Sequence, residues 1–135
     1  MQLKSLTSLF VLVCLSAPIG ASDESIVYIV SPADGATVGN PVRVIFGLRG
    51  PFGIAPAGMA KDNTGHHHLL IDSDLPDLGS PIPKDEKHRH FGGGQTETVI
   101  ELSPGEHTLQ LLLGDFAHIP HVPPMVSERI TIVVE

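Results

Sequence analysis

Three clusters of histidine are the residues in this sequence best suited to chemistry. The chain has eight histidines, and all but one lie in the segments His66-His67-His68, His88-x-His90 and His118-x-x-His121. A neutral imidazole nitrogen is a good ligand for copper, zinc and nickel, whereas magnesium and calcium prefer oxygen. The clusters therefore indicate a site for a transition metal, with copper or zinc as the expected ion.

Spacing within the clusters selects the candidate ligands. Successive side chains of a β-strand point to opposite faces, so His66 and His68 can bind one ion while His67 faces away. The same spacing lets His88 and His90 act together. The predicted metal ligands are His66, His68, His88, His90, His118 and His121. Four protein ligands would close a structural site, whereas three with an open position would allow carriage or catalysis.

The elements that must position these histidines are strands. Apolar and β-branched residues alternate with polar ones, Pro and Gly separate the segments, and no useful stretch has the period of a helix. The sequence predicts an all-β fold, a single antiparallel immunoglobulin-like β-sandwich of six to seven strands. The expected strands cover residues 25–30, 41–48, 66–71, 96–102, 107–113 and 126–134, with a short irregular strand around 88–91.

This order of strands would bring the histidine clusters to one end of the sandwich. Consecutive antiparallel strands reverse direction, so every second connection lies at the same end. Residues 66–68, 88–90 and 118–121 fall at that end, and we expect them to form one site. His107 begins the sixth strand and falls at the other end, where an ordinary strand-edge histidine is expected. The glycines after Phe91 would let the backbone pass close to the histidines.

The N-terminus has the pattern of a secretory signal peptide. Lys4 precedes an apolar run, Leu9–Leu15, and small residues lead to Ala21. We expect a signal peptide over residues 1–21 and one domain over residues 22–135, released as a periplasmic or secreted protein. The apolar run is too short for a membrane span, so no membrane insertion is expected after cleavage. Val13 before Cys14 does not suit lipid attachment.

Cysteine content and charge exclude several classes of function. Cys14 is the only cysteine, so the expected mature domain has no disulfide, thiolate nucleophile or cysteine-rich metal site. The formal net charge of −7 disfavours nucleic acid as a partner and favours cations. The sequence lacks the Gly-x-Ser-x-Gly motif of many nucleophilic hydrolases. Met59 and Met125 are isolated in the sequence and give little indication of a methionine copper(I) site.

Several segments resemble a known family. They are Ser31–Val38, Thr64–Asp72, His88–Glu97, Pro104–Asp115 and His118–His121. Together they are similar to the bacterial secreted family catalogued as domain of unknown function 4399, and this resemblance implies no particular activity. Ser31–Val38 alone also resembles the opening of periplasmic copper-resistance carriers. Those carriers are β-sandwiches, so the second resemblance supports the predicted fold.

Three functions fit these features. The leading hypothesis is a periplasmic protein that binds or carries copper or zinc without catalysis. Its expected partner is the metal ion, and another envelope protein is a second candidate partner. A copper/zinc redox enzyme of the superoxide-dismutase type is an alternative, because such enzymes also use His-x-His strands on a β-sandwich. A structural or partner-binding envelope module is the third, in which the histidines would hydrogen-bond loops together without metal.

Overall fold

The computed structural model describes residues 26–135. The expected signal peptide over residues 1–21 lies outside the described residues. Within the described part every regular element is a β-strand, as the sequence predicts. No helix in residues 26–135 is long and apolar enough to cross a membrane.

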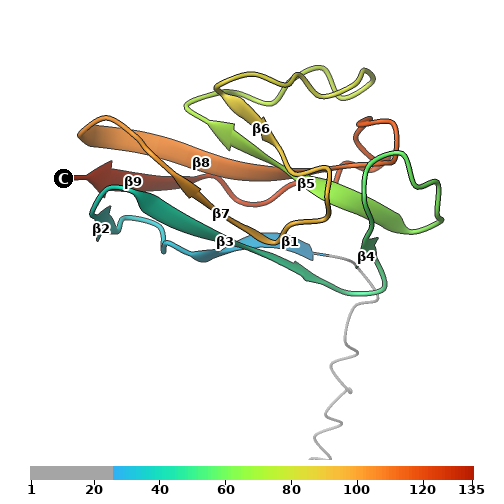
Figure 1. The fold of residues 1–135 in the computed structure, drawn as a ribbon, viewed down its shortest axis with the longest axis horizontal. Helices are drawn as coiled ribbons and strands as arrows, with labels where there is room; N and C mark the ends of the chain where they lie inside the picture. Colours follow the sequence, from blue (N-terminus) through green and yellow to red (C-terminus); the bar gives the residue numbers. More distant parts are fainter. Residues whose placement is uncertain (1–25) are drawn as a thin grey trace, which may run out of the picture.

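The strands form two sheets (Figure 1). The smaller sheet has the order β1-β3-β7, and these strands are Ile26–Ser31, Val42–Arg49 and Glu97–Ile100. The larger sheet has the order β2-β9-β8-β5-β4, and these strands are Thr37–Val38, Ile130–Val134, Gly105–Gly114, Thr64–Ile71 and Gly53–Ile54. Beside this path, β6 (His88–His90) pairs with β5.

This topology is that of an immunoglobulin-like β-sandwich. One sheet contains the equivalents of strands A, B and E, and the other contains the equivalents of G, F and C. All pairings are antiparallel except two short ones, β2 with β9 and β4 with β5. The predicted fold class is therefore confirmed for the described residues.

Some element ends differ from the prediction. The last strand begins at Ile130 rather than at residue 126. At Ser127 the side-chain hydroxyl, in place of a backbone carbonyl of the strand, accepts the hydrogen bond from the Leu111 amide, at 2.8 Å. Val126 makes only an isolated bridge to Leu112. The strands β2 and β4 were not predicted, because two residues carry no periodic signal.

Alternation along the strands builds a core between the sheets. Val42, Val44 and Phe46 of β3 belong to the same buried cluster as Leu109 and Leu111 of β8. Burying one such side chain is worth about 1.5–3 kcal/mol. We expect a core of this kind to hold the fold together without a metal ion.

The larger sheet is also buried on its outer face. Leu70 of β5 and Leu112 of β8 pack with Ile82 in a second apolar cluster. Ile82 belongs to the segment between β5 and β6, which lies over the larger sheet on the side away from β1 and β3 (Figure 1). Both faces of β5 are consequently buried, and its histidines are enclosed whichever way they point.

Candidate metal centre

Four histidine rings meet on the outer face of the larger sheet, and we call them the histidine cluster. The ring centroids of His66, His68, His90 and His118 lie 4.7 to 6.0 Å apart in every pair. One ring nitrogen from each of His66, His68 and His90 lies within 4.8 Å of the other two. The structure thus brings together four of the six predicted ligands.

Strand alternation and register place three of these rings. His66 and His68 share one face of β5 with Leu70, while the residues between them face the inter-sheet core, as the sequence predicts. The antiparallel pairing of β5 with β6 sets His90 directly opposite His68. Residues in that position project from the same face of a sheet, so the rings meet at a centroid distance of 5.1 Å.

His118 reaches the cluster on the loop that follows β8. Gly114 at the end of β8 bridges to Pro120, which closes a tight loop around His118. The His118 carbonyl oxygen accepts a hydrogen bond from the Ile82 amide at 2.8 Å. The loop is therefore tied to the segment that covers the larger sheet.

Asp115 fixes the shape of this loop. Its Oδ1 accepts hydrogen bonds from the amides of Ala117 at 2.8 Å and Ile119 at 2.9 Å. His118 has a φ of 68°, in a region that residues with side chains seldom adopt. The carboxylate holds the backbone on both sides of that residue, which keeps the ring directed at the cluster.

Two glycines make room for the imidazole rings. A Cβ added to Gly114 would lie 2.9 Å from Cε1 of His68. A Cβ added to Gly92 would overlap the ring of His90. Gly92, the first of the glycines after Phe91, thus lets the backbone pass beside a histidine, as the sequence predicts.

Burial favours the neutral form of His66, His68 and His90. It lowers the pKa of His66 to about 4 and that of His68 to about 3, and neighbouring histidines add to the effect in both cases. Burial also lowers the pKa of His90, again reinforced by His118. A neutral imidazole has a lone pair to offer, so these residues can bind a metal ion at neutral pH without first losing a proton.

The cluster also contains buried nitrogens with no hydrogen-bond partner. Both ring nitrogens of His66 and of His68 and the Nε2 of His90 lack a partner among the described residues. An unsatisfied buried polar atom costs about 1–3 kcal/mol. A metal ion would take a lone pair from each ring, so this donor set fits a nitrogen-liganded transition metal.

His88 was predicted as a ligand, but the structure places it outside the cluster. Its Nδ1 lies 2.8 Å from Asp85 Oδ1 and its Nε2 lies 3.2 Å from Ser73 Oγ. Both nitrogens are thus engaged in fixing the segment between β5 and β6. Spacing pairs His88 with His90, but it does not show which hydrogen bonds each ring makes.

His121 was also predicted as a ligand, and it lies on the opposite face of β5. Its ring packs edge-on against Phe52 with centroids 4.9 Å apart. A Cβ added to Gly65 would lie 2.9 Å from its Nε2, and the Cβ of that position points to the opposite face from His66. The backbone of β5 therefore separates His121 from the histidine cluster.

His67 faces the core between the sheets. Its ring is fully buried against Phe46, with centroids 5.2 Å apart. Burial lowers its pKa to about 4, and neither ring nitrogen has a hydrogen-bond partner among the described residues. The preference for His66 and His68 over His67 agrees with this placement.

His107 lies far from the cluster, as expected, and forms a second polar group with Asp72 and Ser103. Its Nδ1 is 2.6 Å from Asp72 Oδ2, and its Nε2 is 2.8 Å from the Ser103 carbonyl oxygen and 3.4 Å from the Ser103 hydroxyl. Because both acceptors require a proton from the ring, the hydrogen bond to Asp72 raises the pKa of His107. The Nε2 lies closer to the Ser103 carbonyl oxygen than to the Ser103 hydroxyl, so the group lacks the short hydrogen bond between nucleophile and base that a catalytic triad has.

Sequence reasoning missed two residues that support the cluster, Gly114 and Asp115. The signal was present, because a Gly-Asp pair ends a strong strand just before a histidine. Asp side chains often accept hydrogen bonds from backbone amides a few residues later in the chain. That pattern predicts an ordered loop, although it does not predict where the loop leads.

Comparisons with known proteins identify a family. Fibronectin(III)-like modules of CbhA from Clostridium thermocellum are similar in structure, with a TM-score of 0.42 and 11% identity over 82% of this chain and 45% of that chain. The chain thus spans less than half the length of that solved chain. No curated protein matches the sequence. A family model matches residues 44–135, which include all four residues of the cluster. The chain therefore belongs to the family described as domain of unknown function (DUF4399).

Proposed function

We propose that the protein binds one transition-metal ion, copper or zinc, at the histidine cluster and carries it without catalysis. One observation carries this proposal: ring nitrogens of His66, His68 and His90 lie within 4.8 Å of one another in a buried site. Each of these residues has at least one buried ring nitrogen with no hydrogen-bond partner among residues 26–135.

The donor set and its spacing suit such an ion. Nitrogens bound to one zinc ion lie about 3.3 Å apart, because Zn–N bonds are about 2.0–2.1 Å long and the geometry is tetrahedral. Small rotations of the three rings would close the remaining distance. The close group contains only imidazole, which favours copper or zinc over calcium or magnesium.

The position of His118 supports the proposal that the protein carries its metal ion and can release it. Its ring is a neighbour of the other three, but its nitrogens are not part of the close group. We propose that His118 is a fourth, exchangeable ligand. Exchange of this ligand would let an incoming donor take the ion, which a closed four-ligand site would resist.

The envelope-module alternative explains the contacts of His88 and His107 better than it explains the histidine cluster. His88 and His107 do hydrogen-bond loops together. His66 and His68 make no hydrogen bond through their rings to any described residue. A role in holding loops together by hydrogen bonds therefore does not explain why His66 and His68 are buried side by side.

We also propose that the domain is periplasmic or secreted. The apolar run Leu9–Leu15 and the small residues leading to Ala21 support this location. Intact-mass measurement of the mature protein should give an N-terminus at Ser22 or Asp23. A retained or lipid-modified Cys14 would contradict the proposal.

Calorimetric titration of untagged residues 22–135 with zinc and copper(II) tests the metal proposal. We expect one tight binding event per chain that His68→Ala and His90→Ala each weaken, while His107→Gln at the other end of the sheet leaves it intact. Several weak events with independent, additive losses would indicate a histidine-rich surface instead. Superoxide turnover by the copper-loaded protein would favour the dismutase-type enzyme.

A further inference from the structure

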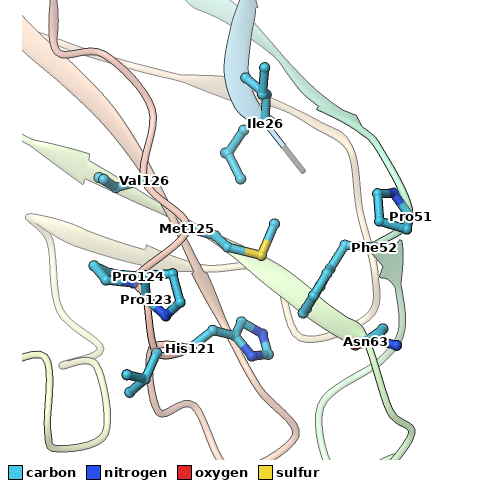
Figure 2. Close-up of a pocket in the computed structure, with 11 residues that line it drawn as sticks. Ile26, Pro51, Phe52, Asn63, His121, Pro123, Pro124, Met125 and Val126 are labelled. Atoms are coloured by element: carbon cyan, nitrogen blue, oxygen red, sulfur yellow. The ribbon is translucent and has the colours of Figure 1, made fainter. Parts of the chain in front are cut away.

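A pocket of about 490 Å³ opens near the start of β1, away from the histidine cluster (Figure 2). Its wall combines apolar side chains with polar groups, and Pro123 and Pro124 lie on the same side as His121 and Met125. The lining residues include Ile26, Phe52, His121, Pro123, Met125 and Val126. Pockets that bind small ligands commonly have a volume in this range.

Two side chains in this pocket carry metal-binding atoms. Figure 2 shows the thioether of Met125 and the imidazole of His121 extending from the same segment into the pocket, with Phe52 facing them. The Nε2 of His121 is buried and has no hydrogen-bond partner among the described residues. The edge-on contact with Phe52, at a centroid distance of 4.9 Å, restrains the orientation of the ring.

The pocket is separate from the histidine cluster. Gly65 has no side chain, and a Cβ there would lie 2.9 Å from Nε2 of His121. The next residue, His66, points to the opposite face of β5 and joins the cluster. One strand of backbone thus divides two groups of donors.

We propose that the Met125 and His121 pocket is a second metal site, selective for copper(I). Thioether sulfur is a soft ligand that selects copper(I) over zinc and other hard or borderline ions. The apolar side chains of Ile26, Phe52 and Val126 border the site, and hydrophobic groups around a metal site control the access of solvent to the ion. Pro123 and Pro124 stiffen the segment between the two donors, which limits how far sulfur and nitrogen can move apart. This inference does not depend on metal binding at the histidine cluster.

Titration with copper(I) under anaerobic conditions, against a chromogenic copper(I) chelator, tests the proposal. Met125→Leu removes the sulfur and keeps the volume of the side chain. We expect its copper(I) affinity at this site to fall at least about 10-fold, since even the loss of an outer-shell partner costs about 10–100-fold. Met59→Leu is the matched control, because Met59 is 53% exposed and lies outside the pocket.

Two further readouts make the test decisive. Zinc binding at the histidine cluster should be the same in the wild type, Met125→Leu and Met59→Leu, so a failure of the cluster is recognised separately. X-ray absorption of the copper(I)-loaded wild type should show sulfur bound to copper, and Met125→Leu should lack it. Equal copper(I) affinity in both variants, or copper bound by nitrogen alone in the wild type, would overturn the proposal. If Met125→Leu fails to fold, the spectrum of copper(I)-loaded Met59→Leu decides the question, because Met125 is then the only methionine left in residues 26–135.

Discussion

In His88 and His107 both ring nitrogens have hydrogen-bond partners, whereas in His66 and His68 neither nitrogen has one among the described residues. This difference separates histidines that fasten the chain from histidines suited to bind an ion. Burial acts in the same direction, because it lowers the pKa values of His66 and His68 and leaves their lone pairs available. At the scale of single residues, the capacity of a histidine to bind a metal ion thus depends on whether its ring nitrogens already have hydrogen-bond partners.

Gly92→Ala should weaken metal binding about 10–100-fold, comparable to the loss of an outer-shell partner. The added methyl group would overlap the ring of His90 and push it away from His66 and His68. Zinc titration of the folded variant measures the effect. Gly39→Ala is the control, since a Cβ there meets nothing within 4 Å, and an equal loss in both variants would refute the steric explanation.

The pair of His107 and Asp72 should stabilise the fold most at low pH. Asp72 raises the pKa of His107 above its ordinary value of 6.5, so the folded state holds this proton more tightly than the unfolded chain. The stabilisation is complete below pH 6.5 and is lost as the pH rises through the raised pKa. Thermal melts at pH 6 and pH 9 should show that Asp72→Asn lowers the melting temperature more at pH 6. An equal effect at both pH values would contradict the assignment.

At the scale of elements, strand alternation was predictable and loop paths were not. The run of three histidines followed by Leu69, Leu70 and Ile71 predicts both the strand and the face that His66 and His68 share. The register that sets His90 opposite His68 depends on a long connection whose folding follows from the packing of Ile82. His118 and His121 are only three residues apart, yet they lie on opposite faces of β5, because Asp115 turns the loop between β8 and Pro120.

Asp115→Ala should therefore remove His118 from the metal site. Without the carboxylate, the amides of Ala117 and Ile119 lose their acceptor, and the strained φ of His118 is no longer supported. Cobalt(II) absorption should then report a change in coordination together with weaker binding. Asp115→Asn keeps an acceptor oxygen and should retain most of the wild-type spectrum. Identical spectra for wild type and Asp115→Ala would exclude a positioning role for Asp115.

At the scale of the whole molecule, the β-sandwich and the candidate site are energetically separable. Side chains of both sheets form the inter-sheet core, and only the face of β5 that carries His67 contributes a histidine from that strand to it. The histidine cluster lies on the other face of β5, beneath the segment between β5 and β6. We therefore expect the fold to persist whether or not an ion is bound at the candidate site.

The metal-free protein should consequently unfold cooperatively, and a metal ion at a hundredfold excess over its dissociation constant should add about 2.7 kcal/mol to the free energy of unfolding.

The metal-free protein should also lose stability in acid. His66 and His67 have pKa values lowered to about 4 from 6.5, so the unfolded chain takes up protons first. Stability is full above pH 6.5 and falls as the pH drops toward 4. Urea unfolding with and without chelator at pH 7 and pH 4.5 measures both effects. A chelated protein without a cooperative transition at pH 7 would instead make the metal structural.

The central claim is that three converging imidazoles bind one ion, and a crystal structure of the zinc-loaded protein tests it most directly. Anomalous diffraction recorded on both sides of the zinc absorption edge locates the ion independently of the protein atoms. We predict one peak within about 2.0–2.1 Å of a ring nitrogen from each of His66, His68 and His90. A peak elsewhere on the chain, with these three rings unliganded, would contradict the account.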